Sequence, residues 1–268
     1  MLTLDQLLQR LWDDYAALNP QAKAIHALLE QRGERIINDH IALRTFDDPR
    51  VGLTALARPF ERLGYRAMED YTFPAKKLRA KHFEHAEPGR PKVFISELKL
   101  AECSPELQAM VRGLIDQMDP SLPQREDFPV SGRPWKVSFA EYEKLAAESE
   151  YAGWMAAWGF RANHFTVDVG ALKTFDSLEQ FNAFLKEVGF KLNSSGGEIK
   201  GSPADLLEQS STLADLAMCD FTDGPRQVPC CYYEFAKRYN KPDGTRFEGF
   251  VAKSADKIFE STDRKARG

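Results

Sequence analysis

The sequence predicts an α+β fold made of two similar modules in tandem. Two stretches with the residue types of a β-strand each carry one histidine, at 38–46 and at 161–169. Each stretch is followed by an amphipathic helical run that stops at an apolar residue, a glycine and an aromatic residue. That glycine comes 24 residues after His40 and 25 residues after His164. Both halves later reach a β-rich run that contains a glutamate. This repeated spacing indicates that one unit of strand, helix and strands occurs twice.

The composition excludes several classes of protein. The chain has 268 residues, of which 43% are hydrophobic and 28% are charged, as in ordinary globular proteins. A net charge of −4 offers no basic field for nucleic acid. No apolar run approaches the roughly 20 residues that a membrane-spanning helix needs. The first residues lack the basic and apolar regions of a secretory signal, so we expect a cytoplasmic protein. Nothing in the sequence indicates an oligomeric state.

We expect a single domain, 1–268, with five consecutive parts. These are an N-terminal helical pair, a first module, a helical insertion, a second module and a C-terminal tail, at 1–34, 36–100, 104–158, 160–238 and 239–268. In the first part, Thr3 and Gln6 form a capping box, and Asn19-Pro20 begins a second helix. The tail contains a turn at 242–244 and then a polar helical segment with a charged end.

The two modules are predicted in more detail from their apolar patterns. In the first, a strand with His40 precedes a helix that begins near Asp48-Pro49, and three strands follow. In the second, Ser177 caps a helix, and the β-rich runs are 190–199, 205–213 and 228–235. The Gly196-Gly197 pair suits a hairpin turn.

The four cysteines form no C-x-x-C pair and are expected to be buried free thiols. Cys230 and Cys231 are adjacent, so a regular strand would point them to opposite faces.

A metal site follows from the duplication. If equivalent strands of the two modules face one cavity, His40 and His164 converge there, and a carboxylate completes a two-histidine, one-carboxylate set. Such a set leaves three positions of an octahedral ion open, as an oxygen-activating iron(II) centre requires. Glu234 is the better carboxylate because it lies in an apolar, aromatic run, where an unpaired charge is costly. Glu97 in the matching run is the alternative, as a fourth ligand, a base or a salt-bridge partner of Lys99 or Arg44.

Arg44 is a candidate for substrate binding. Residues four apart on a strand project to the same side, so Arg44 shares the face of His40, and Ala42 between them leaves room. A guanidinium there could bind the carboxylate of a metal-bound substrate in bidentate fashion. A surface arginine beside a core histidine is the alternative, and both interpretations stay open.

Further polar residues allow two interpretations each. Small hydroxyls, an amide and an amine between 198 and 212 could bind substrate oxygens or could be ordinary turn and edge-strand residues. They are Lys200, Ser202, Gln209 and Ser211. Asp168, at the place of Arg44 in the second module, could shape the pocket or form a surface salt bridge. His82 and His85 lie three apart on a strand, hence on opposite faces, and are expected to be solvated.

The tandem modules, with metal ligands on their first and last strands, resemble the vicinal oxygen chelate (glyoxalase-like) superfamily. More closely, the segments 39–46, 162–166, 209–212 and 233–235 resemble the 2-oxoadipate dioxygenase/decarboxylase family, also called hydroxyglutarate synthase. The resemblance extends over nearly the whole chain. It implies βαβββ modules around a mixed, half-open barrel with helices outside.

The resemblance also implies a chemistry. Iron(II) would be held by His40, His164 and Glu234, and Arg44 would bind the carboxylate next to the keto group. The family reaction joins O2 with a 2-oxo diacid, loses CO2 and leaves a 2-hydroxy acid one carbon shorter. For 2-oxoadipate the product is 2-hydroxyglutarate, in lysine breakdown. The alternatives are a glyoxalase-type lyase or isomerase that uses Zn²⁺ or Ni²⁺, and a metal-free small-molecule-binding protein. Hydrolase chemistry is a weaker third, since the chain has no G-x-S-x-G motif.

Overall fold

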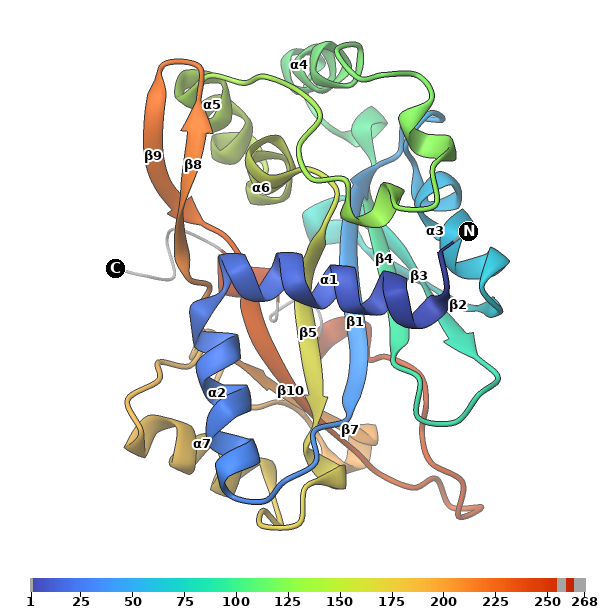
Figure 1. The fold of residues 1–268 in the computed structure, drawn as a ribbon, viewed down its shortest axis with the longest axis vertical. Helices are drawn as coiled ribbons and strands as arrows, with labels where there is room; N and C mark the ends of the chain where they lie inside the picture. The colour runs from blue at the N-terminus through green and yellow to red at the C-terminus, as the bar shows by residue number, and fades with distance from the viewer. Residues whose placement is uncertain (1, 255–258, 263–268) are drawn as a thin grey trace.

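The computed structural model describes residues 2–254 and 259–262, which form a curved mixed sheet of eight strands with helices outside it (Figure 1). The strand order is β2-β3-β4-β1-β5-β10-β7-β6. The strands are β1 (Asn38–Phe46), β2 (Tyr65–Phe73), β3 (Leu78–His85), β4 (Lys92–Leu98), β5 (Ala162–Asp168), β6 (Lys200–Ser202), β7 (Leu207–Ser211) and β10 (Tyr232–Arg238). This α+β half-barrel confirms the predicted fold class.

The two modules meet in the middle of the sheet. There β1 and β5 pair in antiparallel orientation, and each has a parallel partner on its other side, β4 beside β1 and β10 beside β5. The first and last strands of both modules therefore occupy the four central positions. All four are almost continuous runs of buried residues, as expected for strands that are covered on both faces.

The helix of the first module, α3 (Leu53–Arg62), begins later than predicted. The carbonyl of Asp48 accepts hydrogen bonds from the amides of Val51 and Gly52, so a turn occupies the segment that contains Pro49. Gly52 is the N-cap residue. The apolar side of the helix then packs against the sheet.

The edge of the second module differs from the prediction. Its helix, α7 (Leu178–Glu187), is capped by Ser177 as expected. The predicted strand 190–199 is wrong, because there only Leu192 forms a bridge, with Thr212, and β6 begins at Lys200. The Gly196-Gly197 turn lies within the intervening loop and joins no hairpin. A separate two-stranded sheet, unpredicted, consists of β8 (Leu216–Phe221) and β9 (Gly224–Pro229).

Helices cover the outer face of the sheet. The predicted N-terminal pair is α1 (Leu4–Leu18), with its Thr3 capping box, and α2 (Pro20–Gln31). In Figure 1, α1 crosses the central strands. The rings of Trp12 and Tyr15 lie 5.2 and 4.9 Å from the ring of Phe165 on β5. Because side chains alternate along a strand, the neighbours of Phe165 point to the inner face.

The insertion forms α4 (Pro105–Ile115), α5 (Phe139–Glu148) and α6 (Glu150–Trp158), at the top of the molecule in Figure 1. Short 3-10 turns connect the elements at Pro74–Lys76, Leu100–Glu102, Leu122–Gln124, Phe128–Val130, Val169–Ala171, Pro203–Asp205 and Phe259–Thr262. In the described part of the chain, no helix is both long and apolar enough to cross a membrane.

The four cysteines are free and buried, as expected. Cys230 and Cys231, however, lie between β9 and β10 and outside any strand. Their Sγ atoms are 3.4 Å apart, so the predicted opposite orientation is wrong.

The tail turns near 242–244, as predicted, with a bridge between Asn240 and Arg246. It then returns over the inner face of the sheet, where the ring of Phe250 lies 4.9 Å from the rings of His40 and Phe94. The predicted charged end, 263–268, lies outside the described residues.

Candidate metal centre

The three side chains predicted as metal ligands meet on the inner face of the sheet. His40, His164 and Glu234 each offer a ligand atom, and these atoms all lie within 4.8 Å of one another. All three residues are at most 4% exposed. Within the described ranges, no other group of three or more His, Cys, Asp or Glu side chains is arranged in this way.

Strand register explains why they converge. His40 is opposite Thr166 across β1 and β5, and Glu234 lies beside the same Thr166 across β5 and β10. His164 is two residues before Thr166, so it points to the same face one step along the strand. Three neighbouring strands thus bring the side chains together, and two of these strands are the first strands of the two modules.

The imidazoles are oriented by the residues that precede them. Nδ1 of His40 donates a hydrogen bond to Oδ1 of Asp39 at 2.7 Å, and Nδ1 of His164 donates to Oδ1 of Asn163 at 3.0 Å. With the proton on Nδ1, Nε2 of each neutral ring carries a lone pair, which is the form that binds a metal.

The Nε2 atoms of the two histidines lie close to the carboxylate oxygens of Glu234. Nε2 of His40 lies 3.4 Å from Oε1 of Glu234, and Nε2 of His164 lies 3.1 Å from Oε2. Despite that approach, Oε2 makes no hydrogen bond to any described residue. Close acceptor atoms repel each other unless a cation lies between them. The donor set therefore fits a divalent metal ion.

Two polar side chains hold the site from the sheet. Nε2 of Gln209 donates to Oε1 of Glu234 at 2.6 Å, and the hydroxyl of Thr166 lies 3.0 Å from Nε2 of His40. The predicted substrate residue Gln209 is thus a direct neighbour of the carboxylate ligand.

Asp39 is itself fixed by Arg238, whose Nε and Nη2 donate to its two carboxylate oxygens at 2.7 and 2.9 Å. Burial opposes ionisation, but Arg238 and His40 hold the pKa of Asp39 well below its ordinary value. Nη1 of Arg238 also donates to the carbonyl of Gly249 at 2.6 Å. Arg238 therefore joins the orientation of His40 to the position of the tail.

The pKa shifts of Glu234 and His164 suit metal ligands, whereas the shift of His40 reflects the two carboxylates beside it. Burial would raise the pKa of Glu234, but His164 and His40 hold it far below its ordinary value, so the group is a carboxylate. Burial lowers the pKa of His164 and keeps its ring neutral. Burial also disfavours charge on His40, but the carboxylates of Glu234 and Asp39 outweigh it and raise the pKa of that ring.

Arg44 shares the inner face, as predicted, and is buried with 1% exposure. Its guanidinium lies over the rings of Tyr151 and Trp154, at 4.9 and 5.0 Å from their centroids. It donates to Oε1 of Glu150 at 3.2 Å and to Oγ1 of Thr262 at 3.0 Å. The arginine is thus held in a dry environment of aromatic rings.

The other predicted substrate residues are placed differently. The hydroxyl of Ser211 lies 2.8 Å from that of Ser261 in the tail. Lys200 is 4% exposed and donates to the carbonyl of Asn193 at 2.6 Å. Ser202 caps the exposed turn that follows β6, with its hydroxyl 2.6 Å from Asp205, and it is not brought to the three ligands. Substrate contact by these residues stays a prediction.

The structure corrects the interpretations of Glu97 and His82. Glu97 forms an ion pair with Arg79 and accepts a hydrogen bond from the amide of Leu53 at 2.6 Å. It is therefore neither in the ligand group nor bonded to Lys99 or Arg44. His82 is 2% exposed rather than solvated, and its Nδ1 lies 2.9 Å from the hydroxyl of Tyr71.

His85 and Asp168 also lie apart from the three ligands. Nε2 of His85 lies 3.2 Å from the carbonyl of Leu63. Asp168 accepts from Nη2 of Arg246 at 2.7 Å, so it takes part in a salt bridge, although the carboxylate is buried.

Tyr232 is a site residue that the sequence pattern does not reveal. Its ring stacks on His164 with centroids 4.5 Å apart, and its hydroxyl, although buried, has no hydrogen-bond partner among the described residues. Burial raises its pKa well above the ordinary value, and the charges of Glu234 and Arg44 also act on the group. Its position two residues before Glu234 is the only sequence signal, and the tail residue Phe250 has none.

The chain matches the 2-oxoadipate dioxygenase/decarboxylase family over residues 4–122 and 131–245. A curated relative is the chloroplastic/amyloplastic 2-oxoadipate dioxygenase/decarboxylase of Oryza sativa subsp. japonica. It is 38% identical over 274 residues, which cover 92% of this chain and 75% of the relative.

Solved structures agree with this match. The hydroxyglutarate synthase of Oryza sativa in complex with 2-oxoadipate is 35% identical, with a TM-score of 0.91 over 97% of this chain and 92% of that chain. A Shewanella frigidimarina protein with a provisional hydrolase label is 54% identical, with a TM-score of 0.89 over 92% and 97%. A Ralstonia eutropha protein assigned provisionally to the glyoxalase superfamily is 22% identical, with a TM-score of 0.76 over 92% and 85%. This last likeness concerns the fold alone and confirms the glyoxalase-like architecture.

Proposed function

The chain belongs to the 2-oxoadipate dioxygenase/decarboxylase family, and on this premise we propose that it is a non-haem iron(II) dioxygenase that acts on a 2-oxo acid like 2-oxoadipate. The reaction consumes O2, releases CO2 and leaves a 2-hydroxy acid one carbon shorter. For 2-oxoadipate, the six carbons divide into 2-hydroxyglutarate and CO2, and both oxygen atoms of O2 are accounted for. The observation that carries the proposal is the convergence of His40, His164 and Glu234 with their lone pairs turned inward.

In this proposal His40, His164 and Glu234 hold the iron from one side, which is the arrangement of facial-triad oxygenases. Bound there, iron(II) supplies Lewis acidity and redox chemistry toward O2 that side chains lack. The protein contributes orientation. Asp39 and Asn163 keep the protons of the two rings on Nδ1, while Gln209 holds the carboxylate of Glu234.

Arg44 binds the carboxylate next to the keto group of the substrate. A guanidinium is permanently charged and pairs with a carboxylate through two parallel hydrogen bonds. The burial of Arg44 between Tyr151 and Trp154 strengthens that pairing, because little water competes for either partner. The bound acid is thereby oriented toward the histidines on the same face.

Tyr232 supplies a further hydrogen bond to the substrate. A buried hydroxyl without a partner costs about 1–3 kcal/mol, and a substrate oxygen near Arg44 would remove that cost. The ring of Phe250, packed on His40, excludes water from the same face. The geometry thus favours the 2-oxo acid and disfavours uncoupled oxidation.

Anaerobic reconstitution with iron(II), followed by O2 uptake with a panel of 2-oxo acids, tests the proposal. We expect 2-oxoadipate to drive uptake with release of an equal amount of CO2. His40→Ala or Glu234→Ala should abolish iron retention and turnover, whereas Arg44→Ala should retain iron but require more substrate. Turnover without O2 on Zn²⁺ or Ni²⁺ would instead show a lyase or isomerase, and ligand binding without turnover would show a binding protein.

A further inference from the structure

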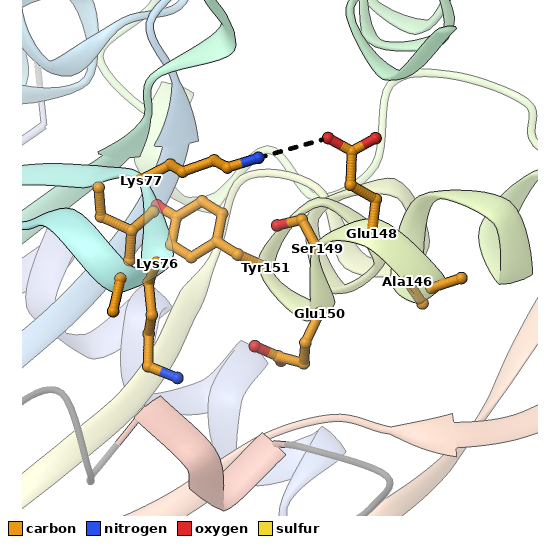
Figure 2. Close-up of a pocket in the computed structure, with 10 residues that line it drawn as sticks. Lys76, Lys77, Ala146, Glu148, Ser149, Glu150 and Tyr151 are labelled. Carbon is orange, nitrogen blue, oxygen red and sulfur yellow. Dashed lines mark ion pairs between the residues drawn. The ribbon is translucent and has the colours of Figure 1, made fainter. Parts of the chain in front are cut away.

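A pocket of about 250 Å³ lies beside Arg44, where the insertion meets the turn between β2 and β3 (Figure 2). Residues 75–78 form one wall of the pocket, and 146–151 form the other. Its last two lining residues, Glu150 and Tyr151, are also the residues that contact the guanidinium of Arg44. These two residues of α6 therefore contact both the pocket and Arg44.

Glu150 lies between the pocket and the buried guanidinium of Arg44. Its side chain is 28% exposed, whereas Arg44 is 1% exposed. Its carboxylate oxygen Oε1 nevertheless lies 3.2 Å from Nη1 of Arg44. The carboxylate thus provides a buried guanidinium with an opposite charge, without which burial of that cation is costly. A substrate carboxylate carries the same charge and can take the same place, so the exchange leaves the charge beside Arg44 unchanged.

The displaced carboxylate has an alternative partner across the pocket. Figure 2 shows the side chains of Lys76 and Glu150 extending toward the same part of the pocket from opposite walls. Lys76 is half-buried and forms no ion pair with a described residue. The neighbouring Lys77 is already paired with Glu148 at 3.6 Å. Of the two lysines, Lys76 is therefore the available cation.

We propose that Glu150 is a carboxylate gate, which pairs with Arg44 in the ligand-free protein, yields that position to the substrate carboxylate and turns into the pocket toward Lys76. The inference rests on the proposed role of Arg44 in binding the substrate. It makes Glu150 and Lys76 determinants of substrate affinity, although neither touches the reacting atoms. The ligand class is a 2-oxo acid whose carboxylate competes directly with a side chain of the protein.

The test is a double-mutant cycle on the binding of 2-oxoadipate to the iron-loaded protein without O2, measured by calorimetry. Glu150→Gln keeps the shape of the side chain and removes the competing charge, so the Kd should fall. Lys76→Gln removes the alternative partner, so the Kd should rise. Both changes should reach up to about fivefold, which is the range for partly exposed ion pairs. In the double variant the effect of Lys76→Gln should disappear, because no gate charge remains.

Glu148→Gln is the matched control. Glu148 lines the same pocket, but its carboxylate is held by the amide of Ser104 at 2.8 Å and by Lys77, so the Kd should not change. With O2 present, Glu150→Gln should change KM and leave kcat unchanged.

Three outcomes would overturn the gate. They are an unchanged or raised Kd in Glu150→Gln, an unchanged or lowered Kd in Lys76→Gln, or a Lys76→Gln effect that persists in the double variant. The last would mean that Lys76 attracts the substrate directly. If Glu150→Gln does not fold, Glu150→Ala takes its place in the cycle, with the same expected and overturning results. Competition in binding without any O2 uptake would refute the proposed dioxygenase function and leave the gate intact.

Discussion

At the scale of single residues, the neighbours Tyr232 and Tyr233 show how one strand divides chemistry between its two faces. Both are fully buried, and neither hydroxyl has a hydrogen-bond partner among the described residues. Tyr232 stacks on His164, and the charges of Glu234 and Arg44 act on it. Tyr233 packs toward Trp12 on α1, and burial alone raises its pKa. Identical side chains thus differ only in the face to which they point.

Tyr232→Phe should therefore separate stability from binding. Removal of an unpaired buried hydroxyl leaves the free energy of unfolding of the ligand-free protein unchanged or raises it, by up to about 3 kcal/mol. The same change removes a donor to the substrate, so the Kd for 2-oxoadipate should rise about tenfold, the equivalent of ~1.4 kcal/mol. Chemical denaturation and anaerobic calorimetry measure the two effects.

Tyr233→Phe is the control for that prediction, since it deletes the same group from the opposite face. It should give the same change in stability and leave the Kd unaltered. If both variants bind 2-oxoadipate as the wild type does, the hydroxyl of Tyr232 does not contact the substrate.

At the scale of elements, register decides which glutamate of the duplicated module can reach the metal. His164 lies beside Tyr232, so Glu234 is two positions further on. In the first module His40 lies beside Lys92, which places Phe94 at the position equivalent to Glu234. Glu97 is an odd number of residues from Phe94 and points to the opposite face. The pattern of residue types suggests that Glu97 and Glu234 are equivalent. The strand register shows that only Glu234 points to the face of the histidines.

Glu97 instead supports the start of α3, because it accepts a hydrogen bond from the amide of Leu53 and pairs with Arg79. Glu97→Gln should lower the free energy of unfolding by about 1–2 kcal/mol, as expected for the loss of a charged partner at a helix N-terminus. Iron affinity, measured against a competing chelator, should stay unchanged. A large loss of iron affinity at unchanged stability would place Glu97 in the metal site after all.

At the scale of the whole molecule, the centre of the duplicated sheet is predicted well from the sequence. The fold class, the central strands and the convergence of His40 and His164 follow from the same spacing in two halves, whereas Glu234 is predicted from its apolar, aromatic surroundings. The β8–β9 hairpin is missed because it occurs once and is mostly exposed, so it lacks a strong apolar alternation. The predicted strand 190–199 is wrong because a loop precedes Lys200. In that segment only Leu192 forms a bridge, and regular pairing with β7 begins at Lys200.

The surroundings of the ligands are less predictable, because they depend on contacts between distant segments. Arg238 joins Asp39 to the tail across about 200 residues of chain. Phe250 reaches His40 only after the tail has folded back over the sheet. Composition and periodicity do not predict these contacts between the tail and the sheet, because the contacts form only in the completed fold.

The metal site joins the two modules, and this arrangement predicts an effect of metal on global stability. His40 comes from the first module, while His164 and Glu234 come from the second, so a bound ion connects both halves. An ion that binds the folded protein alone stabilises it by about 2.7 kcal/mol at a free concentration 100 times its Kd. For a chain of this size that corresponds to a rise in Tm of roughly 5–10 °C.

Thermal unfolding of the iron-loaded protein under nitrogen, with and without a chelator, measures this effect. His164→Ala should melt at the same temperature in both conditions, because the ion has lost a ligand. His26→Gln changes a histidine on α2 outside the site and should keep the full difference. A wild-type Tm that does not respond to iron would mean that the three side chains do not share an ion, and the proposed chemistry would fail with it.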